Sequence, residues 1–266
     1  MQAGDIRVYF ETAGEGPGVL FIGGTGGDLR IRPSVMDGPL KKHFELVSYD
    51  QRGLGQTDKP DFPYSMADYA HDAAALIDAG GWDSCHVVGY SFGGMVAQEL
   101  AIRYPEKINR LVLCATSAGG AGGASYPLHD LEAMPVKQRI PTAMAIRDTR
   151  MDADWQAANP DAVVDFARQA GTTRQKFGHE ENWAKGRDHQ LDARRDHDCW
   201  DRLHLIAAPT LICAGQYDGI APVANHDLMV GRIPDARMMV FDGGHIFIAE
   251  DRSAYPAIID FLKDAD

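Results

Sequence analysis

The sequence predicts an α/β fold in which helices flank a mostly parallel central sheet. Short apolar runs alternate with longer helical patterns along the 266 residues. Nearly continuous apolar runs of this kind are typical of parallel strands that are covered on both faces. The alternation is interrupted once, between Thr116 and Pro209, where no convincing core strand occurs. The order of the elements therefore indicates a βαβ core with one long insertion.

The predicted strands are short runs bounded by turn residues. The first, DIRVYFETAG (5–14), reads as an early antiparallel strand. The core strands are GVLFIG (18–23), FELVSYD (44–50), CHVVGY (85–90), RLVLCA (110–115), PTLICAG (209–215) and RMMVF (237–241). Helices are predicted between them at 66–79, 92–104, 222–231 and 253–263. Pro105 ends the second of these helices, because proline disfavours helical backbone at the preceding residue.

The insertion begins with the glycine-rich segment SAGGAGGAS (117–125), which we interpret as a flexible exit from the core. Helical patterns follow near 135–147, 160–170 and 179–192. Long structureless segments are rare inside a compact domain. The insertion is therefore expected to be a mostly helical structure of its own.

We predict two domains from this arrangement: a core formed by residues 1–116 and 209–266, and a helical cap, or lid, formed by residues 117–208. Three of the four tryptophans lie in the insertion: Trp155, Trp183 and Trp200. A cap over one end of the sheet explains both the length and the aromatic content. The alternative is an ordinary helical layer whose tryptophans form its own core.

The charge of the chain argues against nucleic acid and anionic membranes as partners. The formal net charge is −12, and no dense run of Lys and Arg is present. Both of those partners are bound mainly through positive charge. We therefore expect a small-molecule substrate, while the sequence gives no indication of an oligomeric state.

Targeting and membrane-spanning segments are not apparent in the sequence. The N-terminal stretch MQAGDIRVYFETAGEGPG has no basic region followed by a long apolar core, and no stretch approaches the ~18 apolar residues that a membrane span needs. We expect a soluble, cytoplasmic protein. Cys85, Cys114 and Cys213 lie within or at the ends of apolar runs, so free core thiols are expected rather than a disulfide framework.

The stretch HVVGYSFGGMVAQELA (86–101) contains a serine with glycines two residues to either side. Its GYSFG segment (89–93) lies between a predicted strand and a predicted helix, which is the context in which a G-x-S-x-G pattern has meaning. Such a turn lifts the serine hydroxyl above the sheet, and the following helix points its free N–H groups at the same place. We predict that Ser91 is a nucleophile. The alternative is a tight turn without a catalytic role.

A serine hydroxyl is a poor nucleophile unless a base takes its proton and a third group orients that base. Of ten histidines, only His245 lies in a glycine-rich loop immediately after a predicted core strand, in RMMVFDGGHIFIAED. Asp218, in PTLICAGQYDGIAP, lies just beyond another core strand and is the predicted carboxylate. Asp242, three residues before His245, is the alternative, although a position so close in sequence is more typical of a turn.

The order Ser91, Asp218, His245 resembles the catalytic triad of the α/β-hydrolase superfamily, and the resemblance covers essentially the whole chain. The segment YDQRGLGQTDKP (49–60) is similar to the loop after the next core strand in that superfamily, and the insertion has the position of its cap domain. Among the branches, the small esterases and lactonases look nearest, including 3-oxoadipate enol-lactonases and aclacinomycin methylesterase. The resemblance implies the α/β-hydrolase fold.

The resemblance also implies an oxyanion hole formed by the backbone N–H groups of Thr25 and Phe92. Many members carry His-Gly before the first of these residues. This chain reads FIGGTGGDLR, with Gly23 in place of the histidine. We therefore expect a loop that is more mobile than usual. The alternative interpretation is a glycine-rich turn without a catalytic part.

These features predict an enzyme that hydrolyses a small carboxylic ester or lactone through Ser91, His245 and Asp218, with an acyl-enzyme intermediate. Two alternatives stay open: a carbon–carbon bond hydrolase with the same triad, and a ligand receptor on the same fold with negligible turnover. The sequence does not identify the acyl or alcohol group. Four further residues are candidates for substrate contact: Gly24, Trp155, Trp183 and His197.

No metal ion and no organic cofactor is expected for this chemistry. The segment RDHQLDARRDHDCW (187–200) is rich in His and Asp, but it lacks a recognised metal-ligand spacing. The glycines at 24–27 and 53–55 complete neither a dinucleotide motif nor a phosphate-binding loop. A helical, solvated face explains the first segment, and turns explain the other two.

Overall fold

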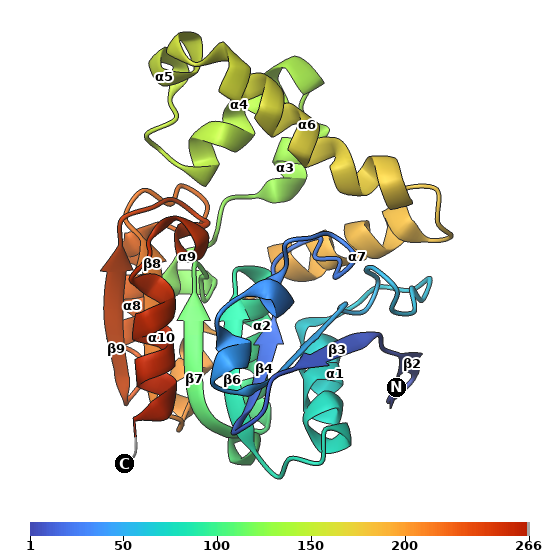
Figure 1. The fold of residues 1–266 in the computed structure, drawn as a ribbon, viewed down its shortest axis with the longest axis vertical. Helices are drawn as coiled ribbons and strands as arrows, with labels where there is room; N and C mark the ends of the chain where they lie inside the picture. The colour runs from blue at the N-terminus through green and yellow to red at the C-terminus, as the bar shows by residue number, and fades with distance from the viewer. Residues whose placement is uncertain (265–266) are drawn as a thin grey trace.

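A seven-stranded sheet forms the centre of the protein (Figure 1). The computed structural model describes residues 1–264. The strands are β3 (Phe10–Ala13), β4 (Gly18–Ile22), β5 (Glu45–Tyr49), β6 (Cys85–Tyr90), β7 (Ile108–Cys114), β8 (Thr210–Gly215) and β9 (Ala236–Phe241). Their order is β3-β5-β4-β6-β7-β8-β9, with β3 antiparallel to β5 and the other pairs parallel. The mostly parallel sheet predicted from the apolar runs is confirmed.

The segment predicted as one early strand (5–14) is divided between two structures. The strands β1 (Gln2–Ala3) and β2 (Ile6–Arg7) form a separate antiparallel pair. Only β3 joins the main sheet, where it is antiparallel to β5, as expected of a leading strand. Residues 8 and 9 belong to neither strand and interrupt the pattern that the sequence presents as continuous.

Helices cover both faces of the sheet. They are α1 (Met66–Ala79), α2 (Phe92–Arg103), α8 (Val223–Val230), α9 (Phe247–Glu250) and α10 (Ala254–Lys263). Along β4, Leu20 and Ile22 join a hydrophobic cluster with residues of α1 and α2. Val19 and Phe21 join a second cluster with residues of α10. Because side chains alternate along a strand, β4 fills two cores and is therefore continuously apolar.

Short 3₁₀ helices mark several of the turns. They are η1 (Val35–Asp37), η2 (Leu40–Lys42), η3 (Pro105–Lys107), η4 (Gly120–Gly122) and η5 (Trp200–Leu205). No helix within residues 1–264 combines the length and apolar character needed to cross a membrane. The four cysteines are buried and free: Cys85, Cys114, Cys199 and Cys213.

Five α-helices lie between β7 and β8, where the sequence predicts the insertion. They are α3 (Leu128–Ala133), α4 (Val136–Arg147), α5 (Ala153–Ala158), α6 (Pro160–Phe177) and α7 (Trp183–Arg195). In Figure 1, α3 to α6 lie above the carboxyl ends of the core strands, and α7 lies lower, beside the core. Helices α3 and α5 were not predicted, and α6 runs beyond the predicted 160–170. The division into core and cap domains stays a prediction.

The glycine-rich segment 117–125 is a packed junction rather than an open linker. At Gly119 φ is +75°, and an added Cβ would overlap the carbonyl oxygen of His197. A Cβ at Gly122 would overlap the ring of Trp200. The interpretation as a flexible exit is corrected on this point, because the glycines allow the start and the end of the insertion to touch.

Glycines also let the end of β6 pack tightly against β4 and α2. A Cβ at Gly89 would lie 2.5 Å from the carbonyl oxygen of Gly93, within van der Waals overlap. A Cβ at Gly93 would overlap the carbonyl oxygen of Ile22, at the end of β4. The two glycines that flank Ser91 are therefore explained by close approach between backbones.

We expect Gly93→Ala to lower the free energy of unfolding by about 1–3 kcal/mol or more, because the new methyl group meets fixed backbone. Gly93 lies inside α2, where alanine normally forms a more stable helix than glycine. A lower free energy of unfolding in the variant would therefore come from the steric overlap. Gly23→Ala is the matched control, since a Cβ there has no neighbour within 4 Å. Urea unfolding measures both variants, and equal stability of the two would contradict the packing argument.

Candidate active site

Ser91 lies in the turn between β6 and α2 with unusual backbone angles. Its φ is +55° and its ψ is −118°, a combination that residues other than glycine rarely adopt. The N–H of Ser91 donates to the carbonyl of Cys114 (2.8 Å), and the hydroxyl of Thr116 donates to the carbonyl of Ser91 (2.8 Å). Both partners come from the end of the neighbouring strand β7. The fold thus holds a strained backbone in place, as is common where a side chain has a function.

Two hydrogen bonds join Ser91, His245 and Asp218. The Nε2 atom of His245 is 2.9 Å from Oγ of Ser91, and its Nδ1 atom is 2.8 Å from Oδ2 of Asp218. With the ring proton on Nδ1, the imidazole donates to the carboxylate and accepts from the hydroxyl. The other carboxylate oxygen accepts from the N–H groups of Ile220 (2.7 Å) and Ala221 (2.9 Å). This arrangement can move the serine proton to the imidazole.

Parallel neighbouring strands bring the acid and the histidine to the same edge of the sheet. Asp218 follows β8 and His245 follows β9, which pairs with β8. Their loops touch, since a Cβ at Gly215 would overlap the carbonyl oxygen of Gly244. Glycine at these positions is therefore what brings the carboxylate within reach of the imidazole.

The backbone of His245 is fixed from two sides. Its N–H donates to the carbonyl of Arg147 (2.6 Å), the last residue of α4. Its carbonyl accepts from the hydroxyl of Tyr90 (2.6 Å). Burial raises the pKa of Tyr90 well above its ordinary value, which keeps the phenol protonated and able to donate. Tyr90, which precedes Ser91, and Arg147 of the insertion therefore fix the position of His245 together.

Asp242, the alternative acid, lies away from the imidazole. Its side chain is 75% exposed and forms an ion pair with Arg150 (3.1 Å). Asp218 takes the position against His245 instead. The geometry therefore favours Asp218 as the orienting carboxylate.

The loop after β4 passes directly beside Ser91. A Cβ at Gly24 would lie 3.4 Å from Cβ of Ser91. Among residues 1–264, no acceptor is found for the backbone N–H of Thr25 or of Phe92, the first residue of α2. The hydroxyl of Thr25 is also buried without a partner. Unpaired donors next to a candidate nucleophile can stabilise negative charge that develops there.

Two glutamines hold this loop. Nε2 of Gln51 donates to the carbonyl of Gly23 (2.8 Å), and Oε1 of Gln190 accepts from the N–H of Gly26 (2.8 Å). Gln190 is fully buried and belongs to α7 of the insertion. Sequence reasoning missed both residues. No local signal identifies them, because each contact joins segments that are distant along the chain.

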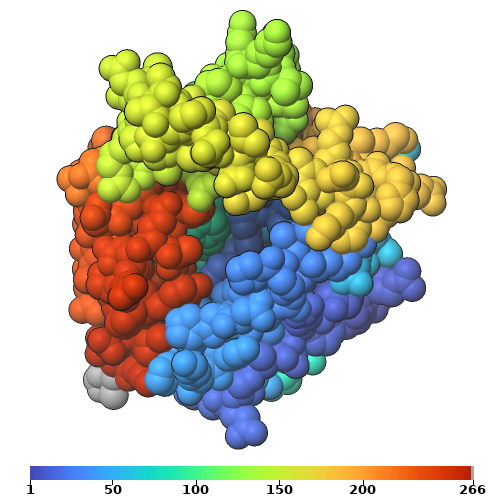
Figure 2. Space-filling model, turned by 45° about the horizontal axis from the view of Figure 1, so that its top comes forward, coloured from blue at the N-terminus to red at the C-terminus, as the bar shows by residue number. Residues whose placement is uncertain are grey.

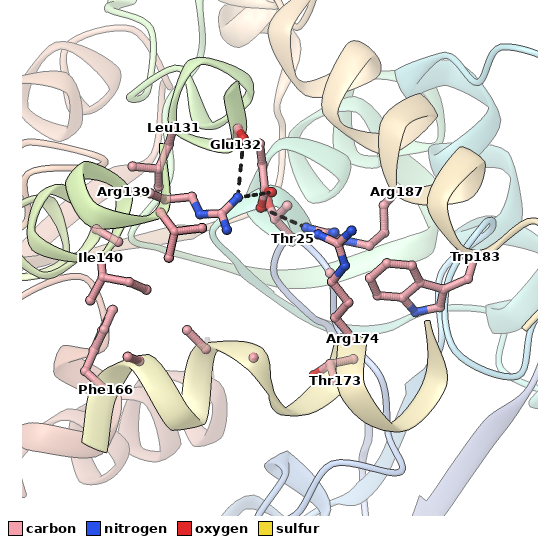
Figure 3. Close-up of a pocket in the computed structure, with 16 residues that line it drawn as sticks. Thr25, Leu131, Glu132, Arg139, Ile140, Phe166, Thr173, Arg174, Trp183 and Arg187 are labelled. Carbon is pink, nitrogen blue, oxygen red and sulfur yellow. Dashed lines mark hydrogen bonds and ion pairs between the residues drawn. The ribbon is translucent and has the colours of Figure 1, made fainter. Parts of the chain in front are cut away.

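A cavity of about 500 Å³ lies between the insertion and the loop after β4. Thr25 and Gly26 form part of its lining, together with residues of α3, α4, α6 and α7 (Figure 3). A second cavity of about 420 Å³ lies on the other side of Gly26, between residues 21–51 and residues 246–255. Figure 2 shows the insertion (yellow) above a hollow that these two core segments (blue and red) border.

The predicted substrate contacts are only partly brought together. Trp183 is buried and lines the 500 Å³ cavity, and Gly24 lies beside Ser91. Trp155, at the start of α5, is not part of that lining. The structure thus places Trp155, a predicted substrate contact, away from this cavity, because the helix that carries it packs on α4 and α6.

His197 is also placed away from this cavity. It is 6% exposed, its Nε2 atom lies 3.6 Å from Sγ of Cys199, and its Nδ1 atom has no partner. It borders a separate cavity with Met95 and Gly119. Burial lowers the pKa of His197 to about 4, so the ring is neutral near pH 7. His197 is buried because it lies between α7 and η5, where the chain leaves the insertion and re-enters the core.

No metal site is apparent within the described residues. Nowhere in residues 1–264 do three or more His, Cys, Asp or Glu side chains gather in a way that could hold a metal ion. In the segment 187–200, Gln190 and His197 point into buried surroundings, while Asp192 and Asp196 pair with Arg195. The acidic side chains of this segment are exposed to solvent, as expected for a solvated helical face.

Comparison with known proteins gives a family match and several relatives. A family described as alpha/beta hydrolase fold matches residues 17–251. The chain is 29% identical over 248 residues to a poly(3-hydroxyalkanoate) depolymerase of Ectopseudomonas oleovorans, covering 92% of this chain and 84% of that protein. It is 23% identical over 259 residues to 3-oxoadipate enol-lactonase 2 of Acinetobacter baylyi, covering 96% and 92%.

A solved structure has the same fold. The enol-lactonase from Burkholderia xenovorans LB400 matches with a TM-score of 0.78 and 22% identity, covering 98% of each chain. At this identity the likeness concerns the fold alone. The predicted α/β-hydrolase fold is confirmed, and these two curated relatives are named as a depolymerase and a lactonase.

We expect the His197 ring to remain neutral at pH 5. A histidine whose pKa falls from 6.5 to about 4 resists protonation in the fold, so between these pH values the unfolded chain binds a proton that the folded chain does not. Its contribution to stability is present above pH 6.5 and decreases by up to about 1.4 kcal/mol per pH unit below it. NMR of the ring nitrogens measures the charge, and titration near pH 6.5 would contradict the buried environment.

Proposed function

Because the chain belongs to the alpha/beta hydrolase fold family, we propose that it is a serine hydrolase that cleaves a small carboxylic ester or lactone. The observation that carries this proposal is the pair of hydrogen bonds from Asp218 through His245 to Ser91. Names of relatives, a polyester depolymerase and an enol-lactonase, point to the same bond type. Nucleophile, base and orienting acid are the parts that acyl transfer to water requires.

In the first proposed step, Oγ of Ser91 attacks the carbonyl carbon of the substrate. Its proton passes to Nε2 of His245, and Asp218 stabilises the charged imidazole through Nδ1. The tetrahedral intermediate then breaks its carbon–oxygen bond to the alcohol. The alcohol leaves with the proton from His245, and the acyl group remains on Ser91. A lactone opens in the same way, with its alcohol attached to the acyl chain.

In the second proposed step, water attacks the acyl-enzyme. His245 removes a proton from that water, and the intermediate collapses with cleavage of the bond to Oγ. The proton returns to Ser91 and the carboxylic acid is released, so the enzyme is restored. The sum of the two steps is one ester bond and one water converted into one acid and one alcohol.

The proposed oxyanion hole uses the N–H groups of Thr25 and Phe92. Both stand free beside Ser91, one on the loop after β4 and the other at the start of α2. In an enclosed site such donors stabilise the developing charge strongly, and removal of one donor costs about 10²–10³ in kcat. Gln51 and Gln190 support this role, because they fix the loop in the absence of a histidine at Gly23.

The insertion (117–208) is proposed to act as a cap domain over the core (1–116 and 209–266). Four of its helices line the 500 Å³ cavity, whose floor includes Thr25. A covered cavity of this size buries most of a small ligand and excludes long flexible chains. Compact esters and lactones therefore fit the site better than long-chain lipids.

We expect Ser91→Ala to lower kcat for p-nitrophenyl acetate by about 10⁶ while the free energy of unfolding changes little, because the triad acts as a unit and the hydroxyl adds little packing. Steady-state kinetics and urea unfolding measure the two quantities. A serine-directed fluorophosphonate should label wild-type protein stoichiometrically at Ser91 and leave the variant unlabelled. Retention of more than about a tenth of the activity would exclude Ser91 as nucleophile.

The same assay separates the two alternatives. One equivalent of product without further turnover would favour a ligand receptor on this fold. Turnover of vinylogous diketones but not of esters would favour a carbon–carbon bond hydrolase. Steady-state turnover of esters is the expected outcome, because the base at Ser91 supports turnover and the names of the relatives point to ester-type bonds.

The carboxylate assignment predicts a contrast between two isosteric variants. We expect Asp218→Asn to lower kcat by about 10⁴, because an amide favours the wrong imidazole tautomer. Asp242→Asn is the matched control, since that side chain is exposed and touches Arg150 rather than His245. A severe loss in the control together with an active Asp218→Asn variant would reverse the assignment.

A further inference from the structure

Three arginines and one glutamate line the cavity beneath the insertion: Arg139 of α4, Arg174 of α6, Arg187 of α7 and Glu132 of α3. Glu132 pairs with Arg139 (3.4 Å) and with Arg187 (3.1 Å). One carboxylate thus serves two guanidinium groups. The lining carries more positive than negative charge, although the chain as a whole has a net charge of −12.

Arg174, in contrast to Arg139 and Arg187, has no carboxylate partner among the described residues. Within residues 1–264, no side chain forms an ion pair or hydrogen bond with its guanidinium group. Arg168, two turns earlier on the same helix, pairs with Asp165 at 2.8 Å. Figure 3 shows Arg174 and Arg187 pointing toward the same part of the cavity, while Arg139 reaches Glu132 from the other side. Like charges directed into one space favour the entry of an anion.

The remainder of the lining is largely apolar. It includes Leu131, Val136, Ile140, Ala143, Phe166 and Ala167. A ligand that matches both parts has a short apolar body and one anionic end. Cavities of this composition take small molecules, with the few charged groups fixing the orientation.

Thr25 connects this cavity to the proposed chemistry. Its hydroxyl is buried without a partner, and its N–H is one of the proposed oxyanion donors. A ligand whose carbonyl lies at Thr25 therefore extends beneath the insertion toward the arginines. The indole ring of Trp183 packs under the guanidinium of Arg187 (4.8 Å), which helps to fix that side of the cavity.

We infer that the cavity selects esters or lactones that carry a second, ionised carboxylate, and that Arg174 binds this group. The inference rests on the proposed hydrolase function, whose substrate class it specifies. A carboxylate fits because the planar guanidinium presents parallel N–H donors that match its two oxygens. A single unpaired guanidinium suits a monoanion at the end of a short chain.

The test compares three chain-matched methyl esters: monomethyl glutarate, methyl hexanoate and the methyl ester of an ω-amino acid. The anionic ester should have the highest kcat/KM and the cationic ester the lowest. The preference should arise mainly in KM, because the charged end is remote from the bond that breaks. It should weaken with added salt, since Arg174 is exposed and salt screens such charges.

Two variants on α6 locate the preference. Arg174→Gln should lower the ratio of kcat/KM for the anionic ester to that for the neutral ester about tenfold, as expected when one charged hydrogen-bond pair is lost. Arg168→Gln removes the same charge outside the lining and should leave the ratio unchanged. Equal ratios in all three proteins would overturn the inference even if every ester is hydrolysed.

Binding without turnover separates this inference from the proposed function. Titration of the Ser91→Ala protein with monomethyl glutarate, followed by tryptophan fluorescence, reports occupancy next to Trp183. The anionic ester should bind more tightly than methyl hexanoate, and the additional change Arg174→Gln should abolish the difference. If the wild type hydrolyses no ester but this difference in binding is present, the proposed function fails and the anion site stands. Equal binding of the two esters would reject the anion site.

Discussion

The close approach of β4, β6 and α2 around Ser91 is the constraint on which the rest of the site depends. Gly93 places the first turn of α2 against the carbonyl of Ile22, so the loop that follows β4 emerges beside the serine. The strained backbone of Ser91 is held in turn by the end of β7. Three strand ends thus determine where the serine hydroxyl, the N–H of Phe92 and the N–H of Thr25 stand relative to one another.

The insertion supports the same site rather than only covering it. The carbonyl of Arg147, at the end of α4, accepts from the N–H of His245, and Gln190 of α7 accepts from the N–H of Gly26. The histidine loop and the loop after β4 are therefore each bonded to a different helix of the insertion. A shift of these helices would move a proton acceptor and an oxyanion donor together, which couples coverage of the cavity to assembly of the proposed catalytic groups.

Sequence reasoning located what is local and missed what depends on tertiary contact. The strand–turn–helix around Ser91 and the loops of Asp218 and His245 have signatures within a few residues, because glycines and strand ends mark them. Gln190 carries no such mark, since its function depends on a loop more than 160 residues away. His197 was misplaced for the same reason: its sequence position beside the returning chain does not reveal that it faces Cys199 and the core.

The contrast between an acidic chain and a cavity rich in arginine bears on how the proposed reaction proceeds. At physiological ionic strength charges are screened beyond about 8 Å, so the net charge of −12 acts weakly on a distant anion, whereas Arg174 acts on one inside the cavity. Hydrolysis then creates a new carboxylate at Ser91, while the Asp218 carboxylate lies on the far side of the His245 ring, bonded to Nδ1. The proposed arginine site therefore acts on the end of the ligand that does not react, and the triad acts on the other end.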